Sequence, residues 1–244
     1  MKLIFEGKNL GSTKDRAVAW GVHLLTASGV LLAMAAVVSI FHHKPGHALL
    51  WLVLAQVVDG LDGPLARKFN VKKHAPVVDG NVLDLVVDYL TCVIVPMAFA
   101  ARFGIFPAQV EMWIIAAILY VSVIWFARKD IETKDMWFRG FPTAWNLVVT
   151  AFWMLGTSQS FNLMASSVLV VLTLTPKVKF FHALSSRQFR NITVPFTTFA
   201  MLVMAWMAQF HQRHNAFGQV VVVAWVVYAG LMTIWRSLQP DELE

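Results

Sequence analysis

Charged residues are scarce in this chain of 244 residues, because Asp, Glu, Lys and Arg together make up only 14% of it. A soluble domain carries about 25%, so a soluble fold is excluded. Cysteine is almost absent as well: the single residue, Cys92, lies in an apolar run, which excludes a disulfide framework. The sequence also shows no internal repeat and no cleavable signal peptide, since its first residues contain lysines but no separate apolar core.

Apolar residues dominate instead, at 58% of the sequence, and they form long runs. A run of about 20 residues is long enough to cross the ~30 Å hydrocarbon core of a bilayer at ~1.5 Å per residue. The sequence therefore predicts an all-α fold, a polytopic integral membrane bundle of about eight transmembrane helices. The expected spans are 17–41, 47–66, 81–101, 110–127, 143–156, 161–176, 193–210 and 218–236.

The basic residues indicate how these spans are oriented. If the N-terminus is cytoplasmic, only Lys44, Arg102 and Arg213 of the 20 Lys and Arg residues face outward. Basic residues near span ends hold their loops in the cytoplasm, so both termini are expected there. Membrane topology then explains the net charge of +6 without nucleic acid as a partner. The expected divisions are a cytoplasmic segment 1–16, a membrane domain 17–236 and a cytoplasmic tail 237–244.

Aspartate is concentrated at the cytoplasmic ends of the second and third expected spans. Asp59 and Asp62 are three residues apart, and Asp84 and Asp88 are four apart, so each pair occupies one helical face. The two helices are antiparallel, which brings the four carboxylates to one depth. An ionised carboxylate inside a membrane costs ~2.5–3.5 kcal/mol even on the lenient scale, so the group implies a compensating cation. Asp79, at the start of the third span, is expected to be a helix N-cap instead.

Glycine and arginine beside these aspartates indicate a phosphate-binding surface. Hard oxygen ligands without nearby His or Cys suit Mg²⁺ or Mn²⁺, which usually keep positions open for substrate phosphates. Gly63 and Gly80 each lie four residues from an aspartate and leave a bare patch of helix where a phosphate can approach. Arg67, one turn after Gly63, offers a planar fork to phosphate oxygens.

The spacing of these residues resembles the signature of the CDP-alcohol phosphotransferases. That pattern reads Asp62-Gly63, two residues, Ala66-Arg67, twelve residues, Gly80, three residues, Asp84, three residues and Asp88. The twelve-residue gap and the eight spans are similar to the bacterial phosphatidylcholine synthases of that family. Further similarity lies in 23–29 and 138–146, so the resemblance covers roughly residues 17–150.

The resemblance implies transfer of the phosphatidyl group from CDP-diacylglycerol to choline, giving phosphatidylcholine and CMP at the cytoplasmic face of a bacterial inner membrane. It also implies two Mn²⁺ or Mg²⁺ ions and a homodimer. The metal ligands would be Asp59, Asp62, Asp84 and Asp88, with Asp88 also the catalytic base. The cytidine diphosphate would be bound by Gly63, Ala66, Arg67, Gly80 and Thr26.

The choline and lipid sites are predicted from residue type and depth. A quaternary nitrogen forms no hydrogen bonds, so an aromatic or acidic enclosure is expected. The candidates are Tyr89, Trp137, Trp145 and Trp153, with Asn146 for the hydroxyl group. Basic loop residues are candidates for the lipid phosphates; these are Lys177, Lys179, Arg187 and Arg190.

Three other functions stay open at this stage. A sibling transferase would use serine, glycerol phosphate or an inositol phosphate, and a phosphorylated acceptor would need further cationic contacts. An intramembrane aspartyl protease also uses paired intramembrane aspartates, but it needs neither metal nor a phosphate-binding arginine. A cation transporter would have an acidic site but release no CMP.

Overall fold

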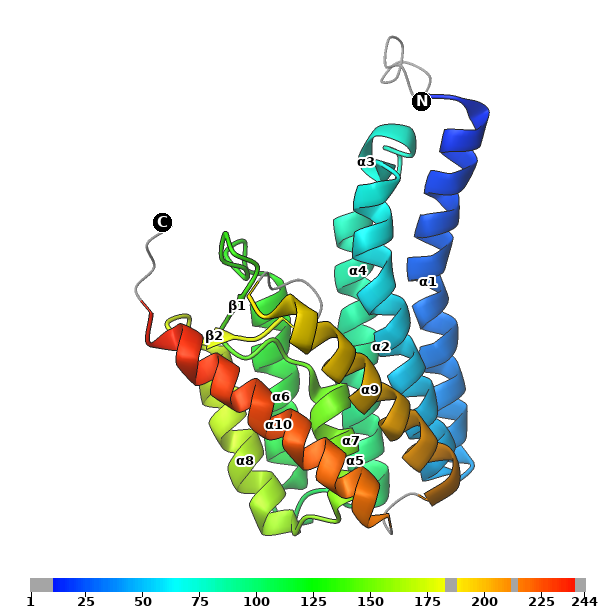
Figure 1. Cartoon of the computed structure of the whole chain (residues 1–244). Coiled ribbons are helices and arrows are strands. Elements are labelled where there is room, and N and C mark those ends of the chain that lie inside the picture. Colours follow the sequence, from blue (N-terminus) through cyan, green and yellow to red (C-terminus); the bar gives the residue numbers. More distant parts are fainter. Residues whose placement is uncertain (1–10, 183–187, 212–214, 240–244) are drawn as a thin grey trace.

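The structure, a computed structural model, describes residues 11–182, 188–211 and 215–239. These residues are mostly helical (Figure 1). The strands among them are β1 (Phe138–Arg139) and β2 (Lys179–Phe180), which pair antiparallel with Phe138 opposite Phe180. The all-α prediction is confirmed. Arg187, one of the predicted lipid-binding residues, lies outside the described residues.

Each expected span corresponds to a helical segment, with small shifts at the ends. The five long segments could cross a membrane by length and composition, and three apolar helices are shorter, at 10–17 residues. The long segments are α1 (Thr13–Phe41), α2 (Pro45–Lys68), the continuous stretch of α4 (Gly80–Asp88), η1 (Tyr89–Ile94) and α5 (Val95–Phe103), α9 (Arg190–Trp206) with η2 (Met207–His211), and α10 (Ala216–Ser237). The shorter helices are α6 (Glu111–Phe126), α7 (Trp145–Leu155) and α8 (Gln159–Thr173), and α3 (Val71–His74) is a single turn after α2.

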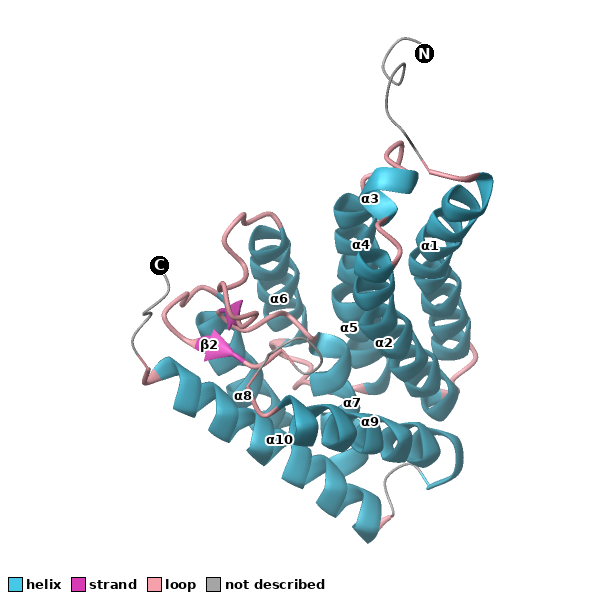
Figure 2. Cartoon of the chain, turned by 45° about the horizontal axis from the view of Figure 1, so that its top comes forward, coloured by secondary structure: helices cyan, strands magenta, loops and turns pink. Residues whose placement is uncertain are grey.

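The helices form two groups with a crossing pair. α1, α2 and α4 stand beside one another, and α6, α7 and α8 form the other group (Figure 1). α9 and α10 run together obliquely across the bundle and contact α2 and α7 (Figures 1 and 2). Residues 127–144, with β1, and the β2 segment occupy one end of the second group.

Local sequence explains the helix starts nearest the aspartates. Ser12 and Asp15 form a capping box at the start of α1: Asp15 N donates to Ser12 Oγ at 3.2 Å and Ser12 N donates to Asp15 Oδ2 at 2.9 Å. Asp79 Oδ1 accepts from the backbone N–H groups of Asn81 and Val82 at 3.0 and 3.3 Å. The prediction of an N-cap at Asp79 is thus confirmed, and this cap fixes where α4 begins.

A π-helical turn, η1, follows Asp88 directly. Such turns occur mostly as single insertions in α-helices, frequently at functional sites, because the wider turn changes which face the following residues present. α1 approaches α4 closely at Gly29, where a Cβ would lie 2.5 Å from Val87 Cγ1. Glycine therefore lets α1 lie against the helix that bears two of the aspartates.

Residues 127–144 are held to the end of α10 by a buried ion pair. Arg236 Nε donates to Asp135 Oδ2 at 2.9 Å, and both side chains are nearly buried. Thr133 Oγ1 and Gln188 Nε2 also donate to the Asp135 carboxylate, at 2.6 and 3.2 Å. Burial alone would raise the pKa of Asp135, but the hydrogen bonds from Arg236 and Thr133 lower it below its usual value. We call Asp135, Arg236, Thr133 and Gln188 the loop clamp.

Candidate active site

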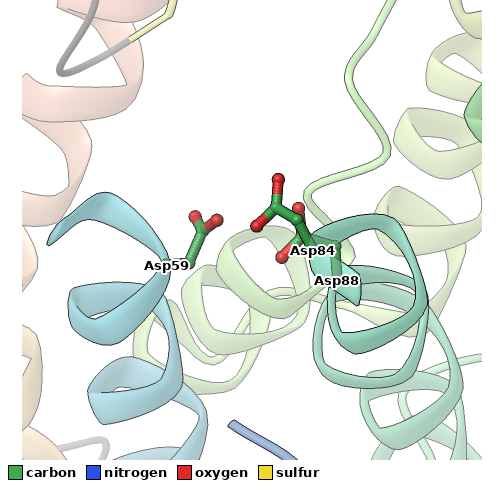
Figure 3. Close-up of side chains that lie close together, drawn as sticks. All are labelled: Asp59, Asp84 and Asp88. Atoms are coloured by element: carbon green, nitrogen blue, oxygen red, sulfur yellow. The ribbon is translucent and has the colours of Figure 1, made fainter. Parts of the chain in front are cut away.

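α2 and α4 bring three of the four predicted metal ligands together. Asp59 on α2 and Asp84 and Asp88 on α4 each offer a carboxylate oxygen, and these oxygens lie within 4.8 Å of one another. Figure 3 shows Asp59 extending from one helix toward Asp84 and Asp88 on the other. The i, i+4 spacing on α4 and the antiparallel course of α2 therefore produce the convergence that the sequence predicted.

Asp62 lies beside this group rather than in it. Its buried carboxyl interacts with the hydroxyl of Thr26 on α1 and with the carboxyl of Asp84. The positive charge of Arg67 also acts on Asp62. The four aspartates are thus contiguous, with Asp62 on the side of α1.

The donor chemistry of the aspartate group fits a divalent cation. Among the residues that the structure describes, no Lys, Arg or His forms an ion pair with Asp59, Asp84 or Asp88. Three close carboxylates repel one another unless a cation lies between them. An all-oxygen ligand set suits Mg²⁺ or Mn²⁺ better than softer metals. The group could therefore hold a metal ion, with Asp59, Asp84 and Asp88 as its ligands.

The predicted nucleotide-binding residues lie around the same aspartates. A Cβ at Gly63 would lie 3.4 Å from the Arg67 guanidinium, so the arginine folds back over the bare turn of α2. A Cβ at Gly80 would lie 3.2 Å from the ring of His23 on α1. Both glycines line the cavity beside the acidic group, with Arg67 against Gly63 and His23 against Gly80.

A single cavity of about 1500 Å³ joins these residues. One end is polar and is lined by all nine residues predicted for metal and nucleotide binding, which are Asp59, Asp62, Asp84, Asp88, Gly63, Ala66, Arg67, Gly80 and Thr26. The other end is mostly apolar and is lined by α9 and α10, with Met201, Met204, Trp225 and Val226 among its residues. Its shape and polarity suit an amphiphilic ligand with a charged head and apolar chains.

The predicted choline residues do not line this cavity. Trp137 and Trp145 are buried, and their indole N–H groups donate to Gln188 Oε1 and Ser122 Oγ. Trp153 packs against Phe99 and Phe103. Tyr89 donates from its hydroxyl to the carbonyl of Leu119 and packs on Phe126, and Asn146 donates to Gln56. Aromatic type and depth selected residues that pack between helices.

The three predicted lipid-phosphate residues that the structure describes also lie away from the cavity lining. Lys177 and Arg190 are exposed, and Lys179 on β2 is buried with Nζ donating to the Pro176 carbonyl. Four other basic residues line the cavity beside Arg67, and these are Lys72, Lys73, Arg128 and Lys129. The sequence shows which loops are basic, but it does not show which of these loops lines the active-site cavity.

Two further polar residues, Glu132 and His182, lie near the aspartates. Neither of them was identified from the sequence. Glu132 lines the cavity, and its charge acts on both Asp84 and Arg67. His182 Nε2 lies 3.8 Å from Glu132 Oε1, and the His182 ring stacks on Phe138 with centroids 4.5 Å apart. Burial and the charge of Arg67 lower the pKa of His182 to about 4, so this ring is neutral at pH 7.

Trp125 lines the cavity next to Phe138. It packs edge-on against Phe138 with centroids 5.7 Å apart, and its indole N–H donates to the Arg139 carbonyl at 3.0 Å. We call Glu132, His182, Phe138 and Trp125 the acidic-aromatic wall. His182 is tens of positions away from the other three in sequence. The signal that could have found Glu132 is only that an acid follows a span end and precedes an aromatic run.

Comparison with known proteins agrees with this geometry. Residues 22–175 match the model of the CDP-alcohol phosphatidyltransferase family. The chain belongs to this family. Its curated relatives include the phosphatidylcholine synthase of Pseudomonas aeruginosa, 44% identical over 94% of this chain and 96% of that protein. The phosphatidylcholine synthases of Borreliella burgdorferi and Agrobacterium fabrum are 30% and 33% identical, over 90% and 84% of this chain and 94% and 81% of theirs. The family match includes α2 and α4, which bear the aspartates.

Proposed function

We propose that this CDP-alcohol phosphatidyltransferase transfers the phosphatidyl group of CDP-diacylglycerol to choline and releases CMP. The observation that carries the proposal is the convergence of Asp59, Asp84 and Asp88 within 4.8 Å at the polar end of a cavity whose other end is apolar. A lipid with a nucleotide diphosphate head fits both ends. The relatives named phosphatidylcholine synthase, which match along most of their length, support choline as the acceptor.

The diphosphate of the donor is assigned to the α2 side of the cavity. Arg67 offers two parallel N–H donors to phosphate oxygens, and Gly63, Ala66 and Gly80 leave backbone accessible beside it. Thr26, which interacts with Asp62, contributes from α1. The acyl chains are assigned to the apolar end between α9 and α10.

Asp59, Asp62, Asp84 and Asp88 would hold two divalent ions, with Mn²⁺ favoured over Mg²⁺. When bound, such ions neutralise the charge that builds on the phosphate oxygens during phosphoryl transfer. The chain's own acid-base group is Asp88. It accepts the proton of the choline hydroxyl as that oxygen bonds to the phosphorus of the phosphatidyl group, and the bond from this phosphorus to the oxygen of CMP breaks.

The acceptor is assigned to the acidic-aromatic wall. A carboxylate and aromatic faces are the groups that attract a quaternary ammonium ion, and Glu132 and Phe138 supply both in the cavity that Asp84 also lines. His182 is neutral at pH 7 and so does not cancel the charge of Glu132. A phosphorylated acceptor would be repelled there. None of the sequence-predicted residues Tyr89, Trp137, Trp145, Asn146 and Trp153 lines the cavity, so their part in choline binding would be indirect.

Four basic residues lining the cavity, Lys72, Lys73, Arg128 and Lys129, are proposed to contact the lipid phosphates in place of the sequence-predicted Lys177, Lys179 and Arg190, which lie away from the cavity lining. Their side of the molecule would be the cytoplasmic one, because basic loops are retained there. This gives a bacterial inner-membrane protein with both termini and the active site toward the cytoplasm. A homodimer is proposed from the family resemblance.

Eight spans are also part of the proposal, although α7 has 11 residues and reaches only ~17 Å at ~1.5 Å per residue. Non-helical backbone is tolerated at membrane depth only where protein satisfies its polar groups. Gly140 N and Phe141 N donate to the carbonyls of Val178 and Leu172, at 2.9 and 3.2 Å. These bonds support a crossing in which residues 140–144 extend the cytoplasmic end of α7.

The deciding assay measures CMP release from CDP-diacylglycerol by the purified protein. Choline should support release, while serine, glycerol phosphate and inositol phosphate should not. Chelation with EDTA should abolish release, and added Mn²⁺ should restore it. Release with another acceptor in place of choline would replace this proposal with a sibling transferase, and activity that survives exhaustive chelation would contradict the metal site.

A further inference from the structure

A chain of two hydrogen-bonded amide side chains links α7 to the aspartate group on α2. Asn146 Nδ2 on α7 donates to Gln56 Oε1 on α2 at 2.6 Å. Gln56 Nε2 then donates to Asp59 Oδ2 at 2.5 Å. The chain therefore joins two helices that meet in the fold, although Asn146 and Gln56 are 90 positions apart in sequence.

The chemistry of each group fixes the direction of this chain. An ionised carboxylate only accepts hydrogen bonds, so the amide that meets Asp59 must present its N–H₂ group. The oxygen of Gln56 then points toward α7 and needs a donor, which Asn146 supplies. Each amide polarises the next, and the chain ends on the charged group. One oxygen of Asp59 is thereby occupied, while the other stays available to a cation.

Asn146 is firmly anchored. Its side chain is 2% exposed, and its backbone carbonyl accepts from Thr150 Oγ1 at 2.6 Å. Its neighbour Trp145 is 1% exposed and donates to Ser122 on α6 at 3.2 Å. These contacts hold this turn of α7 in place and keep the amide within reach of Gln56.

Keeping this asparagine in an apolar helix has a cost. Asn146 Oδ1 is buried and has no hydrogen-bond partner among the described residues. A buried polar atom without a partner destabilises a fold by about 1–3 kcal/mol. Packing alone would favour leucine at this position, so the amide is better explained by what its N–H₂ group does.

We propose that Gln56 and Asn146 are positioning residues that hold the Asp59 carboxylate in the orientation in which it binds the metal. Neither touches the reacting atoms: Gln56 acts on Asp59, and Asn146 acts on Gln56. The inference rests on the proposed metal-dependent transfer, and it adds two residues that the aspartate signature does not contain. It also makes α7 part of the metal site, although α7 carries none of the ligands.

The test is direct Mn²⁺ binding, measured by electron paramagnetic resonance of free Mn²⁺ on the purified protein in detergent without substrates. Loss of a residue that orients a metal ligand typically weakens metal binding about 10–100-fold. Gln56→Leu should raise the Mn²⁺ dissociation constant by that factor, and Asn146→Leu by less. Gln56→Met serves as the second variant if Gln56→Leu does not fold. Asn162→Leu is the matched control, because Asn162 is also 2% exposed but bonds to the Ile105 carbonyl, away from the aspartates.

The double variant separates a chain from two independent effects. If Asn146 acts only through Gln56, the variant with both substitutions should bind Mn²⁺ as weakly as Gln56→Leu alone. Wild-type affinity in Gln56→Leu, additive losses in the double variant, or an equal loss in Asn162→Leu would each overturn the inference. A wild-type protein that binds no Mn²⁺ and releases no CMP would overturn the proposed function itself, which is a different result.

Discussion

The four aspartates of α2 and α4 and the single aspartate of the loop clamp are all buried or partly buried, yet their surroundings differ completely. Asp135 accepts hydrogen bonds from a guanidinium, a hydroxyl and an amide. Asp59 accepts from one amide and otherwise faces other carboxylates. The difference teaches how to interpret a buried acid. A buried carboxylate whose charge is balanced by neighbouring donors stabilises the fold, whereas a cluster of carboxylates whose charge is not balanced indicates a ligand-binding site.

The largest effect is expected from Asp88→Asn. Removing the proposed base should lower kcat for choline-dependent CMP release by about 10²–10⁴-fold. The substitution also removes one of several mutually repelling charges, so the melting temperature of the metal-free protein should stay the same or rise. A metal-free variant that melts well below the wild type would show that Asp88 stabilises the fold, as Asp135 does, and would break the comparison.

The opposite pattern is expected from Arg236→Leu in the loop clamp. Removing one partner of a buried ion pair leaves an uncompensated charge and costs about 3–5 kcal/mol. The melting temperature should fall steeply, while the Mn²⁺ affinity of the protein that remains folded should be close to that of the wild type. Replacing both Asp135 and Arg236 by leucine should recover much of the stability, since no charge is then left alone.

The contrast also explains what the sequence could and could not predict. Asp84 and Asp88 share a helix, and Asp59 and Asp62 share its antiparallel neighbour, so local spacing was enough to predict their convergence. Glu132 and His182 are separated by 50 positions and meet only because residues 127–144 fold back and β1 pairs with β2. Helical or strand spacing along the sequence cannot predict a contact between residues this far apart. Trp137 and Trp145 had the right residue type for choline, but their indole N–H groups are used within the core.

Gln56 is a second residue whose function could not be predicted from the sequence. It lies three residues before Asp59, where helical spacing alone puts it in reach of the carboxylate. A lone glutamine in an apolar span gives no sign of its function, however, until its second partner, Asn146, is known. The fold of the helices was thus largely predictable from hydropathy, and the parts of the site made by residues on one helix or on neighbouring helices were predictable from spacing.

Glu132 is intermediate between the two kinds of acid, and its substitution should have a smaller effect. Its side chain is 37% exposed, with His182 at 3.8 Å as a weak partner. Glu132→Gln should raise the KM for choline about 3–10-fold, since a cation–carboxylate contact at a partly exposed site is worth about 1 kcal/mol, and should leave kcat and the KM for CDP-diacylglycerol nearly unchanged. Asp130→Asn is the matched control, because Asp130 pairs with Arg128 and does not line the cavity. Equal choline KM values for both variants would remove Glu132 from the acceptor site.

The smallest expected change is the dependence of the loop clamp's stabilisation on pH, and it distinguishes the loop clamp from any other source of pH dependence. The pKa of Asp135 is lowered in the folded protein, because the hydrogen bonds from Arg236 and Thr133 outweigh the effect of burial. A lowered folded-state pKa means that the unfolded chain takes up the proton first. The stabilisation by Asp135 is therefore complete above the ordinary carboxyl pKa of 3.8 and is lost as the pH falls through the lower folded-state value. Melting temperatures of wild type and Asp135→Asn should thus differ by a constant amount from pH 8 to pH 5 and converge only in stronger acid; convergence already near neutral pH would mean that Asp135 is not held by Arg236 in the way that separates it from the aspartates of the cavity.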